Sequence, residues 1–180
     1  MTSTLTINRA PVLTLWAAVV AERLGYSRDE ALTLGRAVAG MNAQSKAVHL
    51  GLREPTPPGE QARKRAAAGT PQTVELLGRA VPVVRTPKGL RAAKEGKPES
   101  ADAVERYLAG KFGDGLDAAR SAMTALAGRF TPAELASTAY ALYERFRPEI
   151  PAGTRGWGAK GVLDLAALAR LGPRAAAKRG

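Results

Sequence analysis

The residues best suited to chemistry lie in the stretch PAGTRGWGAKG, residues 151–161, which combines four glycines with Arg155 and Lys160. Glycine lets the backbone come close to a bound group, and phosphate is held by backbone amides together with cationic side chains. The stretch therefore predicts an anion-binding loop in which Arg155 and Lys160 supply the charge. A second interpretation stays open, in which Trp157 packs into the core and the stretch is only a tight connection.

The same stretch lacks the arrangement of a nucleotide-hydrolysing phosphate loop. Such a loop has two glycines separated by four residues, then lysine and a hydroxyl residue, and it joins a strand to a helix. Gly153 and Gly158 have the glycine spacing, but Ala159 stands at the lysine position and Gly161 at the hydroxyl position. The preceding element is expected to be a helix that ends at Pro148, not a strand. Nucleotide hydrolysis is therefore not expected.

Basic side chains outnumber acidic ones and are concentrated in parts of the chain. The sequence holds 27 Lys and Arg against 16 Asp and Glu, a formal net charge of +11, yet residues 98–150 alone have an excess of acids. Clustered cations neutralise phosphates with little geometric demand, which favours duplex DNA or another polyanion as partner. A solvated surface that keeps the protein soluble is the alternative. The candidate nucleic-acid-binding residues of the linker and the expected hairpin are Arg63, Lys64, Arg65, Arg79, Arg85, Lys88 and Arg91, with Lys94 and Lys97 beside them.

Residues 17–36 resemble a helix-turn-helix. That unit has a small residue where its two helices cross, a glycine in the turn four residues later, and apolar residues that fix the angle between the helices. Ala21 and Gly25 stand at the first two places, and Val20, Leu24, Tyr26 and Leu34 occupy the apolar ones.

The resemblance implies a groove-facing second helix that carries Arg28, Arg36 and Lys46, and it makes the following hairpin similar to the phosphate-contacting wing of a winged helix. Asp29 and Glu30 depart from this pattern, because two carboxylates at the front of the second helix would repel phosphates. A generic helical hairpin is the alternative.

Metal and acid–base chemistry have few candidate residues. The sequence has no cysteine, which excludes disulfides, zinc ribbons and thiol nucleophiles. The single histidine, His49, is expected at a helix end near unpaired carbonyls. The acidic pairs Asp102/Glu105 and Asp114/Asp117 lie near expected helix starts, where the helix dipole favours carboxylates. We therefore expect no metal, no cofactor and no catalytic residue.

Apolar spacing and helix-end signals predict the elements that must position these side chains. Helices are expected over residues 10–25, 27–49, roughly 101–110, roughly 116–128, from 131 to before Pro148, and within 162–171. Ser27 with Glu30, and Thr131 with the acid three residues later, have the spacing of capping boxes. Two strands, 73–77 and 81–85, are expected to form a hairpin around Gly78 and Arg79, and Pro82 predicts an edge position for the second.

The expected fold is mainly α, a helical domain with one short β-hairpin at about 73–85. Residues 1–53 form an N-terminal helical hairpin, 54–72 a basic flexible linker, 73–97 the hairpin with a basic turn segment, 98–172 a C-terminal helical part and 173–180 a basic tail, together one structural domain. The longest apolar run, residues 13–21, is too short to span a bilayer, so we expect no membrane partner and a cytoplasmic location.

These features favour a non-enzymatic DNA-binding or nucleoid-associated regulatory protein that holds the phosphate backbone through its basic clusters. The alternative is a helical adaptor or homo-oligomer with no nucleic-acid role. An enzyme acting on a phosphorylated small molecule through Arg155 and Lys160 is a third hypothesis, with no general base or nucleophile evident beside them. The chain as a whole resembles bacterial proteins to which no activity can be attached, and that resemblance implies no mechanism.

Overall fold

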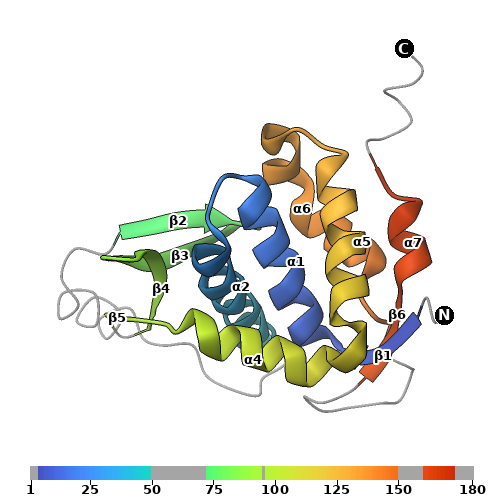
Figure 1. The fold of residues 1–180 in the computed structure, drawn as a ribbon, viewed down its shortest axis with the longest axis horizontal. Helices are drawn as coiled ribbons and strands as arrows, with labels where there is room; N and C mark the ends of the chain where they lie inside the picture. The colour runs from blue at the N-terminus through green and yellow to red at the C-terminus, as the bar shows by residue number, and fades with distance from the viewer. Residues whose placement is uncertain (1–3, 50–71, 95, 150–159, 173–180) are drawn as a thin grey trace.

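The computed structural model describes residues 4–49, 72–94, 96–149 and 160–172, without the side chains of 43–49. Figure 1 shows α1 in the middle, with α2 and a small sheet on one side and α5, α6 and α7 on the other. The elements in chain order are β1 (Thr4–Asn8), α1 (Arg9–Arg23), α2 (Arg28–His49), β2 (Gln72–Leu76), β3 (Arg79–Thr86), β4 (Gly89–Lys94), β5 (Lys97–Pro98), α4 (Ala101–Phe112), the 3-10 turn η1 (Gly113–Gly115), α5 (Leu116–Gly128), α6 (Pro132–Phe146), β6 (Lys160–Asp164) and α7 (Leu165–Ala169).

Helix α1 is the centre of the core. Every residue from Pro11 to Ala21 is buried, and α1 contacts α2, α4, α5 and α6. Only Thr14 interrupts an apolar sequence in this range, which is the composition of a helix with no solvent-facing side. Trp16 is completely buried; its Nε1 donates to the carbonyl oxygen of Ala139 in α6 at 2.9 Å, and its ring meets Phe146 edge-on. The central helix thereby joins both halves of the chain in one buried cluster.

Helices α1 and α2 cross at very short range because the crossing residues are small. A Cβ atom on Gly35 would lie 2.5 Å from the carbonyl oxygen of Thr14 and 2.8 Å from the amide nitrogen of Ala18. Gly25, at φ +113°, makes the turn between the two helices. The expected helices at 10–25 and 27–49 are confirmed, and Gly35 is the residue that lets them pack this closely.

The start of α2 is tied both to its own first turn and to the sheet. Glu30 forms the expected capping box, accepting from the backbone N–H of Ser27 at 2.9 Å and donating its own N–H to the Ser27 hydroxyl. Its second carboxylate oxygen accepts from the N–H of Leu90 in β4 at 2.9 Å. These backbone donors, Ser27 first and then Leu90, lower the pKa of Glu30 below its ordinary value. One turn later the Thr33 hydroxyl accepts from the N–H of Ala92.

The expected hairpin exists as β2 and β3, joined by Leu77 and Gly78, both at positive φ. Positive φ at both central residues is the geometry of a type I′ turn. The prediction that Pro82 puts its strand at an edge is wrong, because β3 lies between β2 and β4. The pairing of β3 with β4 begins only at Val83, however, so Pro82 itself has a strand partner on one side only.

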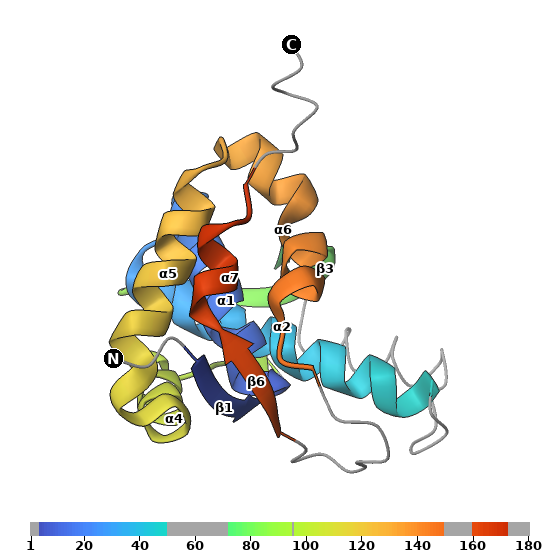
Figure 2. The ribbon, with the colours of Figure 1, turned by 90° about the vertical axis from the view of Figure 1, so that its right-hand side faces the viewer.

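The expectation of a mainly α chain with one short hairpin is wrong, since the fold is mixed α and β. A four-stranded antiparallel sheet in the order β2-β3-β4-β5 packs on α2, and a separate two-stranded antiparallel sheet joins β1 to β6. In Figures 1 and 2, β1 and β6 lie side by side at the base of α7. The register pairs Thr4 with Asp164 and Asn8 with Lys160.

The last short helix, expected within 162–171, is also different. Residues up to Asp164 belong to β6, and α7 begins at Leu165, where the Asp164 side chain accepts from the N–H of Ala166. A Cβ atom at Gly161 would collide with the backbone of Glu149, so this glycine permits the strand to pass the end of α6. The glycine is needed here for a close backbone contact within the protein.

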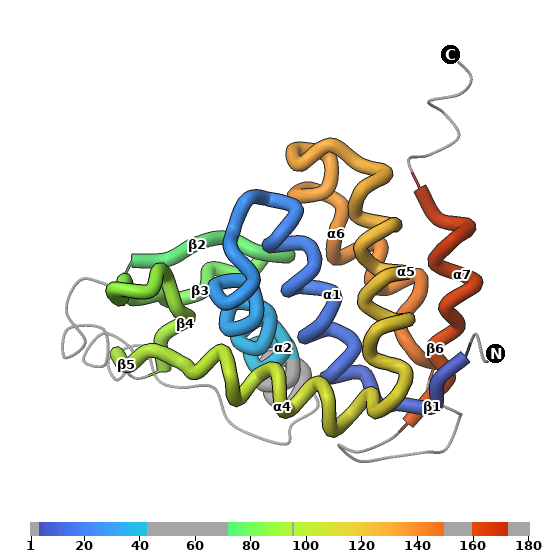
Figure 3. The backbone as a smooth tube through the Cα atoms, in the orientation of Figure 1, coloured from blue at the N-terminus to red at the C-terminus, as the bar shows by residue number. Residues whose placement is uncertain are grey.

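The C-terminal helices follow their predictions closely. Figure 3 traces α4 directly into α5 through η1, and α6, which follows α5 in the chain, packs against α1. Thr131 and Glu134 form the second capping box, with Pro132 in the first turn of α6. The apolar stripe of α5 is buried as expected: Leu116, Met123, Leu126 and Ala127.

Candidate anion-binding surfaces

Four basic side chains lie on β3, β4, β5 and their turns: Arg85, Lys88, Lys94 and Lys97. We call them the sheet cations. All four are exposed, and no carboxylate of the described residues forms an ion pair with any of them. Lys94 and Lys97 are direct partners in the β4–β5 register. Like charges directly opposite each other destabilise an antiparallel pair, so this arrangement has a cost that a bound anion would remove.

The other two predicted cations of this region are engaged inside the protein. Arg79 donates to the side-chain oxygen of Asn42 in α2 at 3.1 Å, and Asn42 also accepts from the hydroxyl of Tyr140. Arg91 is buried, donates to the carbonyl of Leu90, and lies 3.8 Å from a carboxylate oxygen of Asp29. The structure thus separates Arg79 and Arg91 from the sheet cations, although all six are close in sequence.

The face of α2 that the helix-turn-helix resemblance assigns to a DNA groove lies against β4 and α4. Thr33 is fully buried beneath β4. Arg28 forms an ion pair with Glu105 of α4 at 3.2 Å, and the guanidinium of Arg36 lies 4.5 Å from the ring centre of Tyr107 in the same helix. A groove contact by Arg28 or Arg36 would have to replace these contacts.

Several predicted residues lie outside the described part of the structure. These are Arg63, Lys64, Arg65 and Arg155, together with the side chain of Lys46. Lys160 is described: it is exposed at the start of β6, opposite Asn8. It follows that Lys160 belongs to a strand and does not precede a helix directly.

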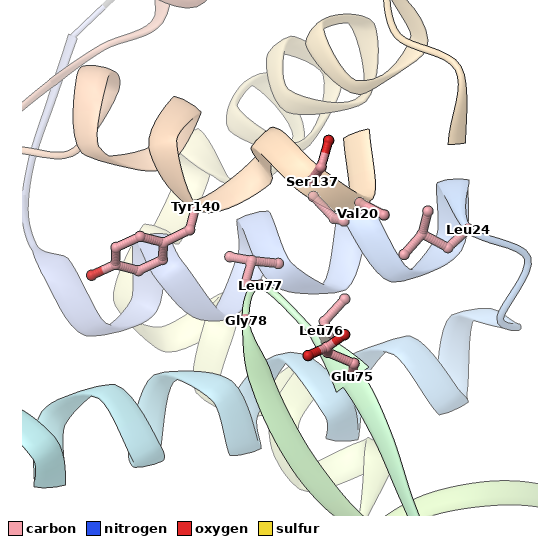
Figure 4. A pocket seen from close by; sticks show the side chains of 9 residues that line it. Val20, Leu24, Glu75, Leu76, Leu77, Gly78, Ser137 and Tyr140 are labelled. Atoms are coloured by element: carbon pink, nitrogen blue, oxygen red, sulfur yellow. The ribbon is translucent and has the colours of Figure 1, made fainter. Parts of the chain in front are cut away.

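An open cleft of about 410 Å³ lies where the β2–β3 turn meets α1 and α6. Figure 4 shows Leu77 at the tip of the hairpin, with Val20 of α1 and Tyr140 of α6 around it. Leu77 adopts φ +50° although it is a bulky residue, and its side chain is only 6% exposed. The hydroxyls at this cleft already have partners: Tyr140 donates to Asn42, and Ser137 donates to a carbonyl of its own helix. The carboxylate of Glu75 also lines the cleft, and it makes no hydrogen bond to either hydroxyl.

Within the described ranges, no three His, Cys, Asp or Glu side chains are grouped so that they could hold a metal ion. None of the helices traced there is both long enough and apolar enough to cross a membrane. Comparisons with protein-family models, with curated proteins and with solved structures find no match to the chain.

Proposed function

We propose that the protein is a non-enzymatic DNA-binding protein that holds the phosphate backbone of duplex DNA through the sheet cations. The observation that carries the proposal is the set of four exposed cations with no acidic partner among the described residues, two of them directly opposite each other in the β4–β5 register. Phosphate contacts of this kind position a protein on DNA without reading its sequence. The proposal rests on the sheet cations and not on α2, where Arg28 and Arg36 contact α4.

The alternative of a helical adaptor or homo-oligomer has less support from the described surface. A stable protein interface has a core depleted of charge and rich in large apolar or aromatic side chains. Among the described residues, Val162 is the one large hydrophobic side chain that is exposed. We therefore place nucleic-acid binding first.

The test is binding of a fluorescent 20-base-pair duplex as a function of salt concentration. Replacing Arg85, Lys88, Lys94 and Lys97 with glutamine should weaken binding and reduce the slope of log affinity against log salt by roughly 3 to 4, since each phosphate contact contributes about 0.9. The matched control is a quadruple variant with the same loss of charge at exposed positions off the sheet: R106Q, K111Q, R145Q and R170Q.

The control should change affinity much less than the sheet variant. Equal effects of the two variants would mean that only net charge matters, and absence of wild-type binding at low salt would refute the proposal itself.

A further inference from the structure

Two arginines from opposite ends of the chain meet where α6 ends and α1 begins. The Nε atom of Arg9, the first residue of α1, donates to the carbonyl oxygen of Pro148 at 2.7 Å, across 139 residues of sequence. Arg147, which immediately precedes Pro148, places its guanidinium 5.8 Å from the ring centre of Tyr143. Because Nε holds Arg9 in place, its two Nη groups remain available, and they make no hydrogen bond to the described residues.

Neither guanidinium has a carboxylate partner among the described residues. Other partly buried arginines do: Arg91 pairs with Asp29, and Arg120 pairs with Glu105. Burial lowers the pKa of Arg9, and the charge of Arg147 lowers it further, while Glu149 acts in the opposite direction from beyond ion-pair distance. The contact of Arg9 with Pro148 therefore brings two partly buried positive charges into one region, and neither forms an ion pair with a described carboxylate.

The aromatic side chain beside Arg147 is buried and does not supply an anion. Tyr143 is 2% exposed and packs edge-on against Phe146. Burial raises the pKa of Tyr143 to about 12, so its hydroxyl is neutral at physiological pH. A third cation is close in the fold, since Lys160 of β6 is paired with Asn8, the residue before Arg9. The first turn of α1 contains no acidic residue.

We propose that Arg9 and Arg147 form a binding site for a phosphate-type oxyanion, with Lys160 at its edge. Guanidinium groups present paired N–H donors that match the oxygens of a phosphate, and a doubly charged anion would balance two arginines where a single carboxylate would not. This site is separate from the sheet cations and goes beyond the proposed DNA binding. The phosphate group belongs either to a free phosphorylated small molecule or to a nucleic-acid backbone.

The test is calorimetric titration of the full chain with inorganic phosphate in a weakly coordinating buffer at low salt. R147Q should bind phosphate about tenfold or more weakly, because a hydrogen bond to a charged group is lost. R145Q is the matched control, since Arg145 lies two residues before Arg147 in the last turn of α6, is exposed and makes no ion pair with a described residue; it should leave the affinity unchanged. Thermal unfolding of both variants checks that each is folded.

E149Q gives an independent test with the opposite sign. Removing the nearby negative charge should strengthen phosphate binding by several-fold if Arg9 and Arg147 hold the anion. Wild-type affinity in R147Q, or equal losses in R147Q and R145Q, would overturn the proposal. If Glu149 instead satisfies Arg9 in solution, E149Q will lower the free energy of unfolding without improving phosphate affinity, and that result would also count against the site.

The DNA-binding assay distinguishes the two sources of phosphate once the site is established. A lower salt slope for duplex binding in R147Q identifies a backbone phosphate, whereas an unchanged slope identifies a small phosphorylated ligand. The sheet-cation variant should still bind inorganic phosphate, so loss of DNA binding through the sheet and failure of the Arg9/Arg147 site are separate results.

Discussion

Replacing Gly35 with alanine tests whether close packing of α1 and α2 holds the core together. The new Cβ atom would lie 2.5 Å from the Thr14 carbonyl oxygen, about 0.9 Å inside ordinary contact distance, and 2.8 Å from the Ala18 nitrogen, with backbone on both sides. Overpacking of this kind costs about 1–3 kcal/mol, and the better helix propensity of alanine returns at most about 1 kcal/mol. We expect G35A to lower the free energy of unfolding by about 1–2 kcal/mol.

Gly40 supplies the matched control on the same helix. It is exposed, and a Cβ atom there would meet nothing within 4 Å. G40A should therefore raise the free energy of unfolding by about 0.5–1 kcal/mol through helix propensity alone. Urea unfolding followed by circular dichroism, with slopes compared as well as midpoints, measures both values. A G35A protein as stable as G40A would refute the close crossing of the helices.

Three further changes test single contacts by the same unfolding measurement. E30Q leaves one carboxylate acceptor fewer and turns an amide donor toward the N–H of Leu90, so the free energy of unfolding should fall by about 1–3 kcal/mol. Because the folded-state pKa of Glu30 is lowered, its ionisation stabilises the fold fully above the unfolded-state pKa, and this stabilisation is lost as the pH falls through the folded-state pKa. The free energy of unfolding of E30Q should therefore lack this part of the dependence on acid pH. W16F removes the donor to the Ala139 carbonyl and leaves a cavity, so the free energy of unfolding should fall by about 2–4 kcal/mol. A fall of less than about 0.5 kcal/mol would contradict the buried placement of Trp16. L77N and L77A both lose the buried side chain, but asparagine tolerates positive φ, so L77N should be the more stable by about 1 kcal/mol; the reverse order would argue against the strained turn.

The helices could be predicted because their signals are local. Ser27 with Glu30, and Thr131 with Glu134, satisfy their own helix ends within four residues, and both capping boxes are present. The apolar positions of α5 repeat with helical spacing, so its buried face follows from the sequence alone.

Most strands could not be predicted, because their stability comes from distant partners. β4 has the sequence GLRAAK, which is poor in β-branched residues, and it is a strand because it pairs with β3 and β5, while Glu30 and Thr33 of α2 accept two of its backbone N–H groups. The alternation of Leu5 and Ile7 in β1 is a weak signal by itself, and its partner β6 lies near the other end of the chain.

The charges of the candidate sites were visible in the sequence, whereas the partners of those charges were not. Arg91 and Lys94 are three residues apart on one strand, yet Arg91 is buried beside Asp29 and Lys94 is exposed. The proximity of Arg9 to Arg147 depends on how α1 and α6 pack, and no local spacing predicts it.

The pairing of β1 with β6 sets an order of events during synthesis. Thr4 leaves the ribosome well before its partner Asp164 is made, because the two residues are 160 positions apart in the chain. Through that interval β1 has a bare edge, and a bare strand edge is a template for another chain. Crowded ribosomes translating one message would hold several such edges close together. A nascent-chain pull-down should therefore find copies of this protein joined through residues 4–8 only while residues 160–164 are still unmade.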